Sequence, residues 1–274
     1  SLQISSSVNV TELKLDTISI NKITADAEIQ FADSTYSGFM NLLVSDSKIQ
    51  NFSLQELHFK SKFNQQKAVN SFAFFASDSL QGEILSELKI NNNPSISFQD
   101  IQLNLNNQIW KGGNDSNYIK FRQDSIEINQ FELSSQQSAL KANGIFAFKG
   151  TEDLHVEIQN LNLINISELH FLPYQISGKV NAFLDISGTA NKPIIKSILT
   201  IDNPEIDSLR FSKFQSDINY TNEKLRFETY LDGYSSRLIN AEFELPLHFS
   251  FTEKFVLPKE DNPIHAIVKI DQLD

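Results

Sequence analysis

Apolar and polar residues alternate along almost the whole chain. Runs with an apolar residue at every second position include Ala25–Phe31, Ile101–Leu105, Val180–Ile186 and Phe243–Phe251. Because successive side chains of a β-strand point to opposite faces, this spacing predicts half-buried strands with one apolar and one polar face. The runs predict about 20 strands, spread from one end of the chain to the other.

Helical spacing is nearly absent. Ile166, Leu169 and Leu172 predict at most one short helix near 166–172, ended by Pro173. Proline disfavours the helical conformation in the residue before it. Alternation with one polar face favours an antiparallel sheet over the doubly buried parallel sheet of α/β proteins. The sequence therefore predicts an all-β fold built from antiparallel strands.

The number of strands restricts the architecture. Open twisted sheets rarely exceed about 10 strands without curling or splitting. A two-sheet sandwich, a long β-solenoid and a sheet bent lengthwise into a gutter with an apolar lining would each bury the apolar face. Similar strand beginnings at Asp46-Ser47, Asp124-Ser125 and Asp207-Ser208 favour the elongated options. About 20 strands spaced ~4.8 Å apart would extend over roughly 95 Å.

No linker interrupts the pattern. We expect residues 1–274 to form a single elongated segment of a longer protein, with a subdivision into 1–164 and 176–274 as the alternative. The chain begins Ser1-Leu2-Gln3-Ile4, without Met and without a signal-peptide pattern. It has no stretch of about 18 uninterrupted apolar residues, so no transmembrane helix is expected.

Composition excludes several classes of function. The net charge of -11 argues against a nucleic-acid partner and against charge-driven docking on an anionic membrane. The lack of cysteine excludes disulfides, thiolate metal sites and cysteine nucleophiles. Phosphate-binding loops, zinc-protease motifs and serine elbows are also missing, and the five histidines lack ligand spacing. We expect no enzymatic activity, no cofactor and no metal site.

One stretch resembles a known family. In Gly178–Ile194 an alternating strand ends in Ser187-Gly188-Thr189 and Pro193 follows, as in the recurrent core of the TamB family. The glycine that often follows this proline in the family is replaced by Ser197. Residues 118–163 resemble the segment before that core, and Leu245-Pro246-Leu247 with Pro263 resembles the part after it. The resemblance covers about 118–271, and the first hundred residues share only the same alternation.

The resemblance implies a fold and a function. TamB-like proteins belong to the AsmA-like superfamily of bridge-shaped proteins in the Gram-negative cell envelope. The resemblance implies a sheet folded over into an apolar-lined groove, the β-taco, and a periplasmic location. It also implies phospholipid traffic toward the outer membrane and an outer-membrane barrel partner of the Omp85 type. The inner-membrane anchor and the partner-binding end of such proteins would lie in parts of the full-length chain outside this segment.

We expect a non-enzymatic conduit that shields phospholipid acyl chains while polar residues such as Glu127, Asp185 and Glu244 face water. A well-filled β core is the other interpretation of the abundant phenylalanine. A different class of function is a structural or assembly module that pairs its sheet edge with a barrel strand or client protein. Carbohydrate binding or hydrolysis is a third. The residues expected to line the groove are Leu103, Leu105, Ile126, Ile128, Val156, Ile158, Val180, Ala182, Leu184, Ile186, Phe243, Leu245, Phe249 and Phe251.

Overall fold

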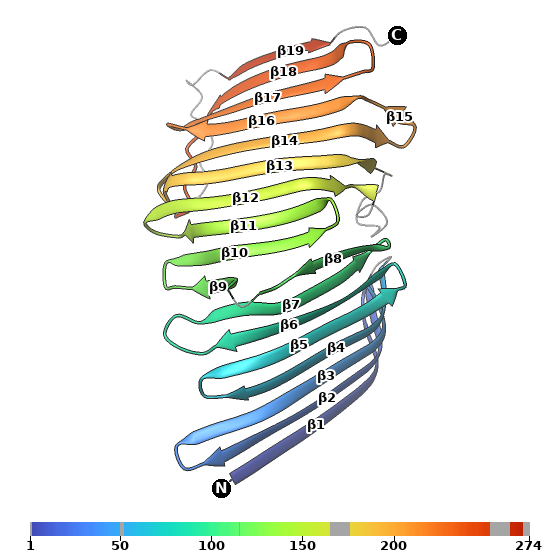
Figure 1. The fold of residues 1–274 in the computed structure, drawn as a ribbon, viewed down its shortest axis with the longest axis vertical. Helices are drawn as coiled ribbons and strands as arrows, with labels where there is room; N and C mark the ends of the chain where they lie inside the picture. Colours follow the sequence, from blue (N-terminus) through green and yellow to red (C-terminus); the bar gives the residue numbers. More distant parts are fainter. Residues whose placement is uncertain (1, 50–51, 115, 165–175, 253–263, 271–274) are drawn as a thin grey trace. The chain divides into compact units, whose positions relative to one another are not determined.

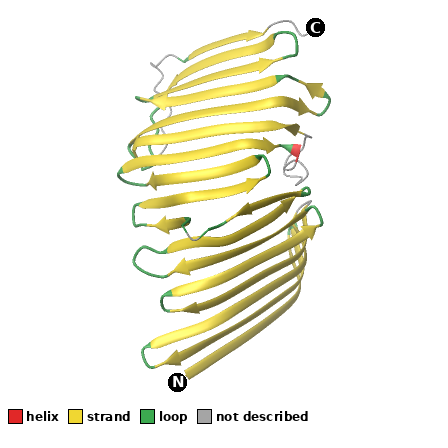
Figure 2. Cartoon of the chain, viewed as in Figure 1, coloured by secondary structure: helices red, strands yellow, loops and turns green. Residues whose placement is uncertain are grey.

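The structure is a computed structural model that describes residues 2–49, 52–114, 116–164, 176–252 and 264–270 (Figure 1). Most of these residues lie in β-strands (Figure 2), and they contain no complete helix. Nineteen strands belong to one antiparallel sheet, in which most strands pair with the next strand along the chain. The prediction of an all-β antiparallel fold is confirmed. The short helix predicted near 166–172 lies outside the described residues.

The chain divides into two compact units. Unit 1 comprises Ser1–Phe121 with Leu133–Ser135, and unit 2 comprises Arg122–Glu132 with Gln136–Asp274. The alternative subdivision near 164–176 falls largely on residues that the structure does not describe, so it stays a prediction.

Unit 1 is an antiparallel meander, and its first strands bend along their length (Figure 1). Its strands are β1 (Leu2–Leu15), β2 (Ile18–Ala32), β3 (Thr35–Ile49), β4 (Phe52–Asn64), β5 (Lys67–Ser77), β6 (Leu80–Lys89), β7 (Ser95–Leu105), β8 (Gln108–Gly112) and β9 (Tyr118–Phe121).

The register of unit 1 aligns its apolar residues into rows that cross the strands. Directly opposite residues of antiparallel strands lie on the same face of the sheet. One row runs through Val8, Ala25, Leu42, Phe59, Phe72, Ile84 and Ile101. The next runs through Val10, Ile23, Val44, Leu57, Phe74, Gly82, Leu103 and Trp110. These two rows form the apolar face of unit 1.

Unit 2 is built in the same way. Its strands are β10 (Ser125–Ser135, of which the last three residues belong to unit 1), β11 (Ser138–Ala147), β12 (Thr151–Asn162), β13 (Ile176–Thr189), β14 (Lys192–Ile206), β15 (Leu209–Arg210), β16 (Lys213–Thr221), β17 (Lys224–Asp232), β18 (Arg237–Pro246) and β19 (His265–Ile270).

Apolar rows also cross the strands of unit 2. The central row runs through Ala142, Val156, Leu184, Ser197, Ile218, Phe227 and Phe243. On either side of it lie a row through Leu154, Ile186, Ile195, Tyr220, Leu225 and Leu245 and a row through Ile158, Ala182, Leu199, Ser216, Thr229 and Ala241. A fourth row runs through Leu161, Val180, Ile201, Phe214, Leu231 and Ile239. These four rows form the apolar face of unit 2.

Residues in the left-handed backbone region reset the alternation within strands. Asn160 in β12 has a φ of 49°, and the register shifts between Ile158 and Leu161. Ile158 lies opposite Ala182 and Leu161 lies opposite Val180, so both side chains are on the apolar face. In a regular strand, residues three positions apart would point to opposite faces. Such bulges re-aim side chains without ending the strand. They explain why the apolar positions shift from even to odd residue numbers, or the reverse, along the sequence.

Few of the residues that the structure describes are fully buried. Most residues of the two apolar faces are half-buried, and few apolar side chains, such as Ile101 and Trp110, are fully buried. The side chains on each face cover their neighbours within the sheet but leave part of their surface accessible.

Candidate functional site

The apolar face of unit 2 contains most of the residues predicted to line a groove. The register places eight of them on this one face, and β12, β13 and β18 carry them: Val156, Ile158, Val180, Ala182, Leu184, Ile186, Phe243 and Leu245. Val180 and Ile186 are buried, the others are half-buried or exposed, and Phe243 retains 38% of its accessible surface. The face is therefore a largely apolar surface, with Ser197, Ser216 and Thr229 among its residues, that a ligand could contact.

The remaining strand residues of the prediction lie elsewhere. Leu103 belongs to the apolar face of unit 1, where it lies opposite Gly82 and Trp110. Leu105 lies at the end of β7, opposite Leu80. Ile126 and Ile128 are half-buried residues of β10.

Phe249 and Phe251 do not belong to the strand rows. They lie in residues 247–252, which follow β18 and are here called the edge segment. The Phe251 ring centroid lies 4.8 Å from that of Phe146 and 5.1 Å from that of Phe249. The Phe249 ring meets Tyr220 edge-on at 5.8 Å. These rings form an aromatic cluster at the strand ends of unit 2.

Hydrogen bonds fix the edge segment to two turns of unit 2 and to Tyr220 of β16. The Leu247 amide donates to the Glu223 carbonyl and the Phe251 amide to the Ala190 carbonyl, each at 2.8 Å. The Tyr220 hydroxyl accepts from the Phe249 amide at 2.9 Å and lies 3.2 Å from the Leu247 and Phe249 carbonyls, which can accept its proton. Tyr220 is 4% exposed. Its hydroxyl is therefore the central anchor of the edge segment.

We expect Tyr220→Phe to destabilise the edge segment by about 1–3 kcal/mol, because it leaves a part-buried amide without its acceptor while preserving the ring. Hydrogen exchange of the Phe249 amide should accelerate by roughly tenfold or more. Tyr230→Phe is the matched control, since the Tyr230 hydroxyl donates only to the exposed Glu228 carboxylate. Unchanged exchange at Phe249 in Tyr220→Phe would contradict the anchoring role.

Glu152 is a buried carboxylate on the apolar side of unit 2, and its two-residue spacing from Leu154 is the sequence signal that places it on this side. It lies opposite Gly188 in β13 and is 2% exposed. Its Oε2 accepts from the Ala147 amide at 2.9 Å, while its Oε1 has no hydrogen-bond partner among the described residues. Burial raises the pKa of the Glu152 carboxyl, and the Ala147 hydrogen bond opposes that rise.

The opposite face of unit 2 is polar and carries paired charges. His155 Nδ1 lies 2.7 Å from Asp185, and His155 Nε2 lies 3.1 Å from Asp153. Glu244 pairs with Lys224 and Arg226 at 2.9 and 2.8 Å, and these hydrogen bonds lower the pKa of its carboxyl. Asp185 and Glu244, both predicted to face water, therefore lie on the polar side of the sheet.

The described residues contain no cluster of three or more side chains able to hold a metal ion. Among the same residues, no helix is long and apolar enough to cross a membrane. Comparison of the chain with protein-family models, curated proteins and solved structures gave no match.

Proposed function

We propose that the apolar faces of this chain bind the acyl chains of phospholipids and that the protein is a non-enzymatic part of a lipid-transport bridge. The observation that carries the proposal is the set of predominantly apolar rows that remain half exposed, with Ser197, Ser216 and Thr229 as polar members of the rows of unit 2. A monomer rarely exposes large contiguous apolar surface unless it meets a partner, a ligand or a membrane. Leucine, isoleucine and phenylalanine side chains offer hydrocarbon tails an environment free of polar groups.

The width of the apolar face suits an acyl chain. On β13 the face extends from Val180 to Ile186, six residues apart, which at ~3.3 Å per residue is about 20 Å. The hydrocarbon core of a bilayer is ~30 Å thick, so the chains of one leaflet span about 15 Å. A tail laid along the strands would be covered, and its head group would project beyond the apolar rows.

The resemblance of residues 118–271 to the TamB family gives this proposal its cellular setting. Under it, the chain is a β-taco segment in the periplasm of a Gram-negative cell, and the lipid moves between the inner and outer membranes. Transfer along the face would be passive. The full-length protein would contact the membranes and an Omp85-type barrel.

Photocrosslinking tests this proposal directly. With p-benzoylphenylalanine in place of Leu184 on the apolar face, we expect phospholipid adducts after irradiation of protein purified from cell envelopes. The matched control carries the same group in place of Asp185, the next residue, which faces the polar side. We expect at least a tenfold lower adduct yield there, measured by mass spectrometry. Equal yields at the two positions, or none at either, would overturn the proposal.

A second candidate function is an assembly module that pairs through a sheet edge. The observation that favours it is β19, in which all six residues are exposed. Ile267, Val268 and Ile270 each retain more than half of their accessible surface. An exposed apolar strand is a template for pairing with another chain. Adducts with protein alone in the crosslinking experiment would favour this function.

A further inference from the structure

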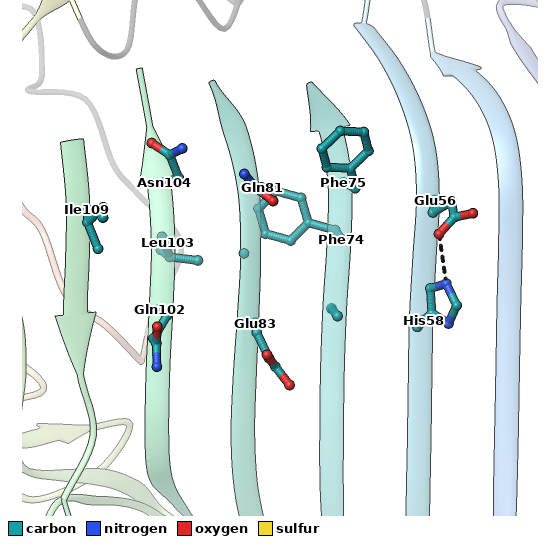
Figure 3. A pocket seen from close by; sticks show the side chains of 12 residues that line it. Glu56, His58, Phe74, Phe75, Gln81, Glu83, Gln102, Leu103, Asn104 and Ile109 are labelled. Atoms are coloured by element: carbon teal, nitrogen blue, oxygen red, sulfur yellow. Dashed lines mark hydrogen bonds and ion pairs between the residues drawn. The ribbon is translucent and has the colours of Figure 1, made fainter. Parts of the chain in front are cut away.

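The polar side of unit 1 contains a hollow of about 430 Å³. Its lining comes from β4 to β8 (Figure 3), and the residues are Glu56, His58, Ala73, Phe74, Phe75, Gln81, Gly82, Glu83, Gln102, Leu103, Asn104 and Ile109. The volume lies within the range of sites that bind small molecules. Nine of the lining residues project from the side opposite to the apolar rows, whereas Phe74, Gly82 and Leu103 also belong to the second of those rows.

The register explains how the hollow forms. Glu56, Phe75, Gln81, Asn104 and Ile109 form one row across five strands, and His58, Ala73, Glu83 and Gln102 form the next. Ala73 lies between His58 and Glu83 and projects only a methyl group. The longer side chains around it leave the space above that methyl group open.

The lining combines an aromatic ring with amide and carboxylate groups. Phe75 and Ile109 supply apolar surface, and Ile109 is 58% exposed. The Gln102 amide donates to the Asp100 carboxylate at 2.9 Å, and the Asn104 amide donates to the Asp78 carbonyl at 2.9 Å. These bonds fix the amide planes before any ligand arrives, which lowers the entropy that binding costs.

The charges of the lining select among ligands. It contains the carboxylates of Glu56 and Glu83 and no lysine or arginine. Phosphates, nucleotides and acidic glycans would therefore be repelled. Glu56 already contacts His58, with Oε2 and Nε2 3.1 Å apart. The described residues around the hollow do not form a metal-binding cluster.

We propose that this hollow binds a neutral oligosaccharide. A sugar ring has an apolar face of C–H groups and a rim of hydroxyls. The apolar face suits the Phe75 ring, and the hydroxyls can donate to Glu83 and to the amide oxygens of Gln81 and Gln102. Each of these partners belongs to a different strand or row, so they surround a ring laid across β5, β6 and β7.

The test uses the whole chain and three probes, namely tetramers of N-acetylglucosamine, β-1,4-glucose and α-1,4-glucose. We expect at least one to give saturation-transfer NMR signals and a measurable dissociation constant in titration calorimetry. Ala73→Trp fills the hollow and should weaken binding by tenfold or more. Glu83→Gln keeps the shape and should weaken it several-fold.

Val69→Trp is the matched control, because Val69 lies on the same strand and the same side, outside the hollow, and is 40% exposed. It should change the affinity less than twofold. Circular dichroism verifies that each variant is folded. The proposal would be overturned if none of the three probes binds at a concentration of about 5 mM, roughly five times a dissociation constant of 1 mM. Equal loss in Ala73→Trp and Val69→Trp, or salt-sensitive binding of pentalysine in place of sugars, would also overturn it.

Discussion

Gly144→Ala is expected to destabilise unit 2 by about 3 kcal/mol or more. Gly144 in β11 has a φ of +118°, where side chains cost roughly 1–2 kcal/mol, and a Cβ there would overlap the Asp153 carbonyl oxygen of β12. Overpacking against backbone adds about 1–3 kcal/mol. Urea unfolding followed by circular dichroism, with hydrogen exchange of β11 and β12, measures the loss.

Gly150→Ala is the control for Gly144→Ala. Gly150 also has a positive φ, +103°, but an added Cβ would meet no atom within 4 Å. Gly150→Ala should lower the stability only by the cost of a side chain at positive φ, about 1–2 kcal/mol. Equal losses in the two variants would show that the close approach of β11 to β12 at Gly144 contributes nothing.

Glu152→Gln is expected to stabilise unit 2 by about 1–3 kcal/mol at pH 8. The substitution removes the negative charge of a buried carboxylate, in which one oxygen has no hydrogen-bond partner among the described residues. The pKa of the Glu152 carboxyl is raised in the folded state above its unfolded value, so the folded state binds the proton more tightly. Stability from this group is therefore present below the unfolded pKa, and it decreases as the pH rises through the folded pKa.

The measurement is urea unfolding of both proteins between pH 4 and pH 8. The wild type should lose stability over this window relative to Glu152→Gln, and the two should converge at the acid end. Glu157→Gln is the control, since Glu157 lies in the same strand on the polar side and accepts from Gln159. If Glu157→Gln increased the stability as much as Glu152→Gln, the effect would not be specific to the buried carboxylate.

The strands were predictable because alternation is a direct consequence of a sheet with one apolar side. The alternate residues from Val180 to Ile186, for instance, lie on one face of β13 as expected. The pattern could not show that Phe249 and Phe251 leave the sheet, since an extended segment outside the ladder has the same spacing. Their partners, Phe146 and Tyr220, are distant in sequence.

Other features depend on backbone geometry that residue type does not reveal. Asn160 adopts a left-handed conformation and resets the alternation, but the chain contains many asparagines that do not. Glu152 shares the alternation of Leu154 and Val156, which places its carboxylate on the apolar side, but the sequence does not show that the side chain is buried there opposite Gly188. The hollow on unit 1 depends on which side chains of five strands become neighbours.

The pairing of consecutive strands has a consequence for how the chain acquires its structure. Among the described strands, β2 forms hydrogen bonds with β1 and β3, and β17 forms them with β16 and β18. Each of these strands therefore pairs with its neighbours in sequence. Contacts between residues close in sequence form quickly, because little loop entropy is lost in bringing them together. The protein can therefore fold hairpin by hairpin as successive lengths of chain become available, without waiting for its last strand.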